Sequence, residues 1–476
     1  MPRQYITLPT APGGHGDGKI RLRCPACGET SSFVELTAGA MVCGWCKFHF
    51  PLEAGPRLDL LVDEGSFQAL RSELAGVSEA PTVTARFGWA TLLGRPLAIA
   101  VSDPSSSWTT ADIQALATLA EAAAREHRPL LWVVTATPGP DSAVHWPGLQ
   151  IALHRLGEAS AGRSRRTASP WVVLLAGPCY GPVAALALQA DLVLAEPGAA
   201  LAAVLPEVLR QAGRLPIEST RSPGALLRAG WADAVLPRQV QRAALADLLA
   251  MLDGGEHPPA LIPGAGDPLP EPFVHLFSSF HEVHGDRQAE DDRALVGGLA
   301  RLKPEGTPLA VVATACGEGW ADVRHRRAGA VGAAGWRKAT RLLRLAGRFG
   351  LPAVLLVDRP KLRAGRRDRP AEVAAALGET VYTLLTLPVP TLAVRLAADE
   401  SLPSLSLALA DQVLAPDELA PLFRQGGRPM DDTFAEHALA SVLAQHVHEL
   451  NQTYTQHGAL GRRALLQRRH IRWRQT

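Results

Sequence analysis

The chain has 476 residues, of which 47% are apolar and 20% are charged, the composition of a globular protein with room for two or three domains. Its 48 basic and 46 acidic residues leave a net charge of +2, so neither a nucleic acid nor a membrane surface is expected as a partner. The apolar runs are shorter than a membrane helix, and residues 1–18 lack the apolar segment of a signal peptide. We therefore expect a soluble, cytoplasmic protein.

Four of the six cysteines form two CxxC pairs, with 15 residues between the pairs. Two such turns that face each other supply four thiolates in the tetrahedral arrangement that zinc prefers. Two disulfides, or four unrelated thiols, are the alternative, but a cytosolic chain keeps its cysteines reduced. We predict a structural Zn²⁺ ion bound by Cys24, Cys27, Cys43 and Cys46.

Beyond the cysteines, apolar runs led by a proline or an aspartate alternate with helical stretches rich in alanine and leucine. In the first half, the leading residues are Pro96, Pro129, Pro170 and Asp191. Continuous runs of this length are typical of parallel strands that are buried on both faces. With helical stretches such as 111–126 between them, they predict an α/β fold.

The same series recurs in the second half of the chain, displaced by 212, 223, 220 and 220 residues. The leading residues there are Pro308, Pro352, Pro390 and Asp411. An offset this constant predicts two copies of one domain, and the proline- and glycine-rich residues between them predict a linker. The predicted organisation is an N-terminal segment with the cysteine pairs over 1–56, a first domain over 57–251, a linker over 252–272 and a second domain over 273–476.

Residues 24–70 resemble the start of the β subunit of bacterial acetyl-CoA carboxylase carboxyltransferase, zinc ribbon included. The second half resembles the α subunit at residues 280–287, 291–292, 296–301 and 335–339. This resemblance implies two crotonase-type ββα spiral domains in tandem after a zinc ribbon, the first β-like and the second α-like. It also implies that an acyl thioester and a carboxyl carrier meet in a cleft between a β-like and an α-like domain, often from different protomers, so we expect a homo-oligomer.

Chemistry of this kind passes through an enolate, whose oxygen needs N–H donors, normally backbone amides of a Gly-Gly turn at a helix N-terminus. In the β-like half the corresponding residues 177–182 read GPCYGP, and Pro182 has no N–H to donate. The catalytic candidates are Tyr180, whose hydroxyl could replace the missing amide, together with Gly181 and Gly139. Cys179 is a candidate for substrate binding. The alternatives are that Tyr180 caps the strand ends and that Cys179 is a small buried hydrophobe.

The α-like half departs further from the family, because no glycine occurs between Gly378 and Gly426. By register from Asp411, the family's Gly-Gly pair falls on Leu402 and Pro403, so we expect that the biotin site is lost and that biotin is not used. Leu402 and Pro403 would instead form one wall of the substrate site. Arg363 lies in a basic run over 359–369 that could bind CoA phosphates or an acidic carrier protein, or could be a solvated loop.

Three functions follow from this pattern. The first in rank is a biotin-independent decarboxylase of a malonyl thioester, carried by CoA or an acyl carrier protein, because only the thioester half of the site would work. The second is a fused β–α carboxyltransferase that uses carboxybiotin to make malonyl-CoA. The third is a non-catalytic family member that acts as a scaffold.

Overall fold

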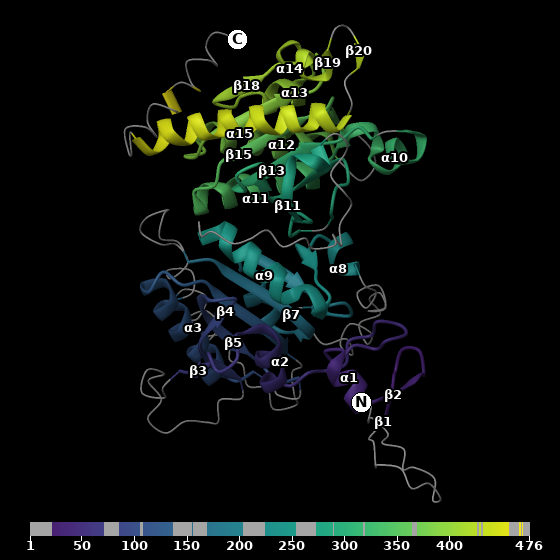
Figure 1. The fold of residues 1–476 in the computed structure, drawn as a ribbon, viewed down its shortest axis with the longest axis vertical. Coiled ribbons are helices and arrows are strands. Elements are labelled where there is room, and N and C mark those ends of the chain that lie inside the picture. The colour runs from purple at the N-terminus through teal and green to yellow at the C-terminus, as the bar shows by residue number, and fades with distance from the viewer. Residues whose placement is uncertain are drawn as a thin grey trace, which may run out of the picture.

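The computed structural model of the chain forms two lobes, each built on one β-sheet (Figure 1). It describes residues 21–70, 85–104, 108–136, 155, 169–202, 224–253, 273–288, 290–317, 319–363, 369–425, 428–429, 432–456, 466–467 and 469. The N-terminal lobe carries the cysteine ribbon on one side, and the C-terminal lobe carries the long helix α15 across its outer face (Figure 1). Within the described residues, no helix has the length and apolar character needed to cross a membrane.

The N-terminal sheet has the strand order β10-β8-β7-β6-β5-β4-β3, with β9 paired to β7. Strands β5 to β8 are parallel to one another, and β4 is antiparallel to β5. The bounds are β3 Gln68–Ala69, β4 Arg86–Leu92, β5 Arg95–Val101, β6 Leu130–Ala136, β7 Trp171–Tyr180, β8 Leu192–Ala195, β9 Ala200–Ala202 and β10 Ala234–Val235. All four apolar runs predicted in this half are strands of this one sheet.

The C-terminal sheet has the order β11-β12-β13-β15-β17-β18 and the same plan, an antiparallel strand followed by four parallel ones. The bounds are β11 Phe277–Glu282, β12 Leu295–Leu302, β13 Thr307–Thr314, β15 Ala353–Val357, β17 Thr391–Arg395 and β18 Gln412–Leu414. Small pairs of strands lie outside it: β14 Ala330–Val331 with β16 Lys361–Leu362, and β19 Arg424–Gln425 with β20 Arg428–Pro429. The predicted duplication is confirmed.

The repeat extends to individual hydrogen bonds. The Leu130 N–H donates to the Pro170 carbonyl at 2.8 Å, and in the second copy the Ala353 N–H donates to the Pro390 carbonyl at 2.9 Å. A strand-leading proline therefore supplies a carbonyl to its neighbour while its own missing N–H breaks no ladder bond. The aspartates match as well, because Asp191 accepts from the Trp171 N–H at 2.9 Å and Asp411 from the Thr391 N–H at 2.8 Å.

The helices cover the sheets in the order expected from the sequence. In the N-terminal lobe they are α1 Phe33–Ala38, α2 Ala54–Leu61, α3 Thr110–Arg125, α5 Pro182–Ala187, α8 Ala225–Arg228 and α9 Arg238–Asp253. In the C-terminal lobe they are α10 Gly319–His325, α11 Ala333–Phe349, α12 Pro370–Thr386, α13 Leu402–Leu407, α14 Pro416–Phe423 and α15 Asp432–Gln456. Ser32 and Thr109 begin α1 and α3 with capping boxes. Helix α9 includes the first two residues of the predicted linker, and residues 254–272 lie outside the described part.

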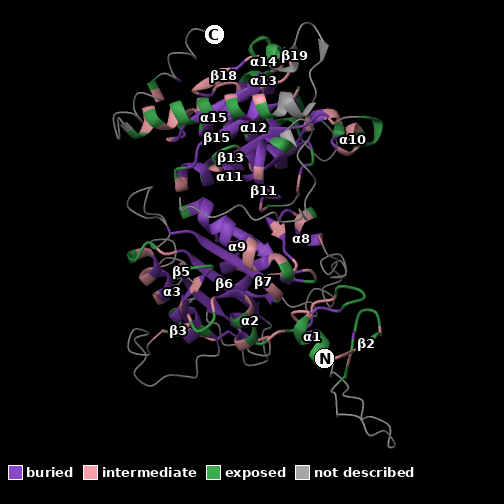
Figure 2. Cartoon of the chain, viewed as in Figure 1, coloured by how far each residue is buried: buried purple, intermediate pink, exposed green. Residues whose placement is uncertain are grey.

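The two lobes share one apolar core, in which Leu245 and Leu249 of α9 belong to the same buried cluster as Trp336 of α11 and the strands of both sheets. Figure 2 shows that α9, which faces the C-terminal lobe, is buried along most of its length. The backbones also approach closely, because a Cβ atom on Gly285 would lie 2.2 Å from Gly230 Cα. The lobes are therefore firmly packed together.

Buried ion pairs reinforce this contact between the lobes. Asp233 of the N-terminal lobe lies 2.6 Å from a guanidinium nitrogen of Arg287 and 2.7 Å from one of Arg341. Asp247 of α9 contacts Arg301 at 2.7 Å and His281 at 2.8 Å. Burial alone would raise the pKa of Asp233, but the two arginine charges outweigh burial and lower it.

Candidate functional site

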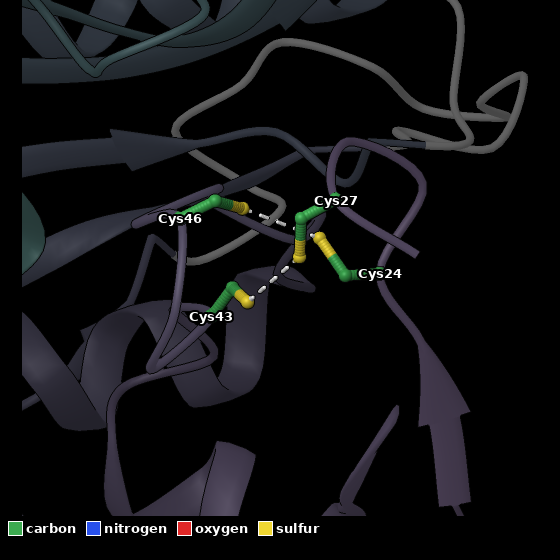
Figure 3. Close-up of side chains that lie close together, drawn as sticks. All are labelled: Cys24, Cys27, Cys43 and Cys46. Carbon is green, nitrogen blue, oxygen red and sulfur yellow. Dashed lines mark hydrogen bonds between the residues drawn. The ribbon is translucent and has the colours of Figure 1, made fainter. Parts of the chain in front are cut away.

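The four cysteines of the ribbon converge on one point from two matching turns (Figure 3). In the first turn the Gly28 N–H donates to the Cys24 carbonyl at 2.9 Å, and in the second the Lys47 N–H donates to the Cys43 carbonyl at 3.1 Å. The sulfur atoms of Cys24 and Cys46 are 3.5 Å apart, and those of Cys27 and Cys43 are 3.8 Å apart.

This sulfur geometry fits a metal ion. Zn–S bonds of about 2.3 Å in a tetrahedron place the sulfurs about 3.8 Å apart, close to both distances. Burial alone would raise the pKa of Cys43, but N–H groups of Cys46 and Trp45 donate to its sulfur and lower the pKa to about 7. All four predicted ligands are thus brought together, in the closed arrangement of a zinc ribbon.

A buried carboxylate, Glu196 at the end of β8, anchors the ribbon to the N-terminal lobe. Its carboxylate accepts hydrogen bonds from Arg57 of α2, from Arg238 and from Gln241 of α9. Arg238 also donates to the carbonyls of residues 40 and 41 in the ribbon, at 3.2 and 3.1 Å. Burial disfavours the ionised form of Glu196, but His49 and the two arginines outweigh burial and hold its pKa well below the usual range.

The turn at the end of β7 carries three of the predicted site residues. Gly181 has φ of 73°, which favours glycine, and it begins α5 with Pro182 at the first helical position. The Gly181 N–H donates to the Ala202 carbonyl of β9 at 2.9 Å, so this amide is used within the sheet. Tyr180 is 7% exposed at the same edge. Gly139 lies outside the described residues.

Cys179 is fully buried and belongs to the apolar cluster of the N-terminal lobe. Burial raises the pKa of its thiol well above the usual range. This position matches the small buried hydrophobe that was the alternative to a substrate contact.

The corresponding turn in the C-terminal lobe lies at the start of α13. Leu402 is 62% exposed and Pro403 is buried. Ser401, the N-cap residue, is held by Asp399, which accepts its N–H at 3.1 Å and its hydroxyl at 2.7 Å. One amide of this turn is thus engaged, and Pro403 has none to offer.

Arg363 is paired inside the chain. Its guanidinium group lies 3.4 Å from Glu290 and 3.5 Å from Asp292, and the side chain is only 13% exposed. These contacts join Arg363, the residue after β16, to residues just before β12. The role of Arg363 as a substrate contact stays a prediction.

The two turns lie in different lobes of the chain. Figure 1 shows β7 in the lower lobe and α13 near the far end of the upper lobe, with α9 and α11 between them. Whether a β-like and an α-like site meet between copies of the chain stays a prediction.

A pocket of about 750 Å³ lies where the lobes meet, between α8 and α10. Its lining includes the four arginines Arg228, Arg293, Arg324 and Arg327 and the two histidines His284 and His325. The run RHRR at 324–327 is a local signal of positive charge in the sequence, but it does not by itself predict a pocket.

His284, at one side of this pocket, belongs to a buried charged group rather than a metal site. His284 and Glu282 lie near Asp291, with His284 Nδ1 2.7 Å from the Asp291 carboxylate. The Lys338 ammonium group is 3.0 Å from Asp291 and 3.5 Å from Glu282, so a cation already stands between the carboxylates. Burial alone would raise the pKa of Asp291, but Lys338 and His284 hold it well below the usual range.

Known proteins match both halves of the chain. A family model described as acetyl co-enzyme A carboxylase carboxyltransferase-like matches residues 271–418. The acetyl-coenzyme A carboxylase carboxyl transferase subunits beta/alpha of Salinispora arenicola is 35% identical over 464 residues, which cover 85% of this chain and 80% of that protein. The protein of the same name from Saccharopolyspora erythraea is 29% identical, over 82% of this chain and 77% of its own length.

Solved structures agree on the fold. The transcarboxylase 12S hexamer structure with hydrolysed methylmalonyl-coenzyme A bound matches with a TM-score of 0.63 and 18% identity, over 83% of this chain and 89% of that one. The prediction of two crotonase-type domains after a zinc ribbon is confirmed.

These relatives overturn one prediction. The first-ranked function, a biotin-independent malonyl-thioester decarboxylase, is wrong, because relatives that match along most of the chain are named carboxyl transferases. Pro182 and Pro403 each change a single turn, whereas the similarity to the relatives extends over 85% of the chain.

Proposed function

The chain belongs to the acetyl-CoA carboxylase carboxyltransferase family, and we propose that it is a fused β/α carboxyltransferase acting on an acyl-CoA, with acetyl-CoA as the first substrate to test. The observation that carries this proposal is the 35% identity that extends over both halves, β-like and α-like, in the same order as in the relative. In such a transfer the thioester α-carbon exchanges a proton for CO₂ by way of an enolate, and the proton would end on the donor that has given up its CO₂.

On the β side, the chain's own contribution is the turn from β7 into α5. Pro182 lacks an N–H and the Gly181 amide is bonded to Ala202, so the enolate oxygen would draw on the Tyr180 hydroxyl and the next amide of α5. The position of Tyr180 as the last residue of β7, directly before Gly181, supports this assignment.

The family implies carboxybiotin as donor, against the expectation that biotin is not used. It would supply CO₂ at the α-side turn. The residues there fit the ureido oxygen poorly, because the Ser401 amide is bonded to Asp399 and Pro403 has no N–H.

The proposed site is built between copies of the chain. Since β7 and α13 lie in different lobes, the β-side turn of one copy would face the α-side turn of another (Figure 1). A homo-oligomer is therefore part of the proposal. The proposed ion in the ribbon is a structural Zn²⁺, since a closed set of four thiolates has no open position for a substrate.

The reverse reaction gives a direct test. Purified protein is incubated with malonyl-CoA, with and without biocytin, and acetyl-CoA is followed by mass spectrometry. We expect acetyl-CoA to form only when biocytin is present, and we expect Tyr180→Phe to slow it. Formation at equal rates without biocytin, or no formation at all, would contradict a carboxyltransferase.

A second candidate is a scaffold without catalysis. The loss of N–H donors on both sides, at Pro182 and Pro403, favours it. In that case neither reaction mixture changes, while the protein still co-purifies with an active carboxyltransferase of the same family.

A further inference from the structure

The pocket between the lobes is strongly basic and does not belong to either turn. Among the described residues that line it are four guanidinium groups and two carboxylates, a formal charge of +2 with the histidines neutral. Asp291 pairs with Lys338, which lies outside the lining, and Glu290 pairs with Arg327 of the lining and with Arg363 outside it. The positive charge of the pocket is thus not balanced by the acids of its own wall.

Arg293 and Arg324 show this imbalance most clearly. The Arg293 guanidinium donates to His325 Nδ1 at 2.8 Å, and Arg324 lies over the ring of Trp320, 5.4 Å from its centre. A neutral imidazole and an indole bring no negative charge. Both arginine side chains therefore present charge to the pocket that an anion can neutralise.

The size and the walls of the pocket indicate what kind of anion fits. A volume of about 750 Å³ is that of a small-molecule site and too large for a single chloride or phosphate ion. Leu227 and Ala321 add apolar surface beside the arginines. Trp320, next to Ala321, is 78% exposed, and its ring contacts the guanidinium group of Arg324, a residue of the pocket lining. Guanidinium groups bind phosphate oxygens with paired, charge-assisted hydrogen bonds.

We propose that this pocket binds a small molecule with two or more phosphate groups, held mainly by Arg293 and Arg324 at the junction of the lobes. Because its walls come from α8 of one lobe and α10 of the other, the ligand would also clamp the lobes together. The phosphate groups could come from free pyrophosphate-like anions or from the nucleotide part of a coenzyme. The two sources differ because only a nucleotide has an aromatic base, which can stack on the Trp320 ring.

Isothermal titration calorimetry of the full chain tests the assignment, with pyrophosphate, coenzyme A and citrate as separate ligands at low ionic strength. We expect saturable binding of pyrophosphate, weakened about tenfold to hundredfold in the double variant R293Q/R324Q, since each lost arginine removes charge-assisted hydrogen bonds. R344Q is the matched control, because Arg344 is 61% exposed on the same lobe and pairs with Glu379 outside the pocket. Its affinity should equal that of the wild type.

Coenzyme A that binds more tightly than pyrophosphate, with the advantage lost in Trp320→Ala, identifies a nucleotide as the source of the phosphates. Equal binding of the two, unchanged in Trp320→Ala, identifies a free phosphate anion. No saturable binding of either, undiminished binding in R293Q/R324Q, or tighter binding of citrate than of pyrophosphate would overturn the proposal. The single variant R324Q, at an exposed position, repeats the test should the double variant fail to fold.

This outcome is independent of the carboxyltransferase proposal, because calorimetry needs no turnover. If the protein binds no phosphate ligand but forms acetyl-CoA in the presence of biocytin, only the proposed ligand of the pocket is refuted. If it binds the phosphate ligand but forms no acetyl-CoA, only the proposed function is refuted.

Discussion

Replacing Glu196 with glutamine should both destabilise the N-terminal lobe and loosen the ribbon. Its carboxylate neutralises two guanidinium groups, and all three side chains are 1–2% exposed. Glutamine has the same size but no charge, so Arg57 and Arg238 would remain buried and uncompensated. Breaking a buried ion pair in this way costs about 3–5 kcal/mol. Guanidinium denaturation followed by tryptophan fluorescence should show this loss in the free energy of unfolding of the N-terminal lobe.

The ribbon provides a second measurement on the same variant. Arg238 holds the carbonyls of residues 40 and 41 close to Cys43, so zinc should transfer faster to a chromogenic chelator in Glu196→Gln than in the wild type. Glu379→Gln is the control, since its partner Arg344 is 61% exposed and such surface pairs contribute less than about 1 kcal/mol. A loss for Glu196→Gln no greater than that of the control would refute the reasoning.

Four further predictions concern single positions. Cys24→Ser should reduce the zinc content, measured by atomic absorption, because three thiolates leave the tetrahedral site open; unchanged content would exclude the ribbon as the metal site. Gly285→Ala should weaken the contact between the lobes, since its Cβ would lie 2.2 Å from Gly230 Cα, and limited proteolysis should then cut between them faster. Gly378→Ala, in α12 with open space around the new Cβ, should instead raise stability by about 0.5–1 kcal/mol in thermal unfolding. The pKa of Asp291 is held below its unfolded value, so its contribution is present above about pH 4 and lost as pH falls further towards the folded pKa; Asp291→Asn should flatten the fall in melting temperature between about pH 5 and 3.

The strands and the repeat could be predicted because each depends on residues close together in sequence. A leading proline or aspartate followed by a short, mostly apolar run is a local signal of a buried parallel strand, and such runs form paired parallel strands in both sheets. The cysteine ligands were predictable for the same reason, since two residues separate each pair.

The sites between distant segments could not be found in this way. Whether Gly181 is a donor depends on Ala202, which lies in a three-residue strand with no distinctive pattern. Arg363 looked like part of a solvent-facing basic run, yet its partners Glu290 and Asp292 lie about 70 residues earlier and in a different element. A run of basic residues indicates that acidic groups lie nearby, but only the fold shows whether those groups belong to the same chain.

Buried aspartates of the two copies differ in where their arginine partners lie, and this difference affects how the lobes fold during synthesis. Asp411 is neutralised by Arg469 within its own half, whereas Asp191 contacts Arg348 of α11, and Asp233 contacts two arginines of the C-terminal lobe. During synthesis the N-terminal lobe is complete at α9 before any of these arginines has been added. The N-terminal lobe would thus emerge from the ribosome before the arginines that pair with its Asp191 and Asp233 have been synthesised. Its final packing therefore requires the C-terminal lobe.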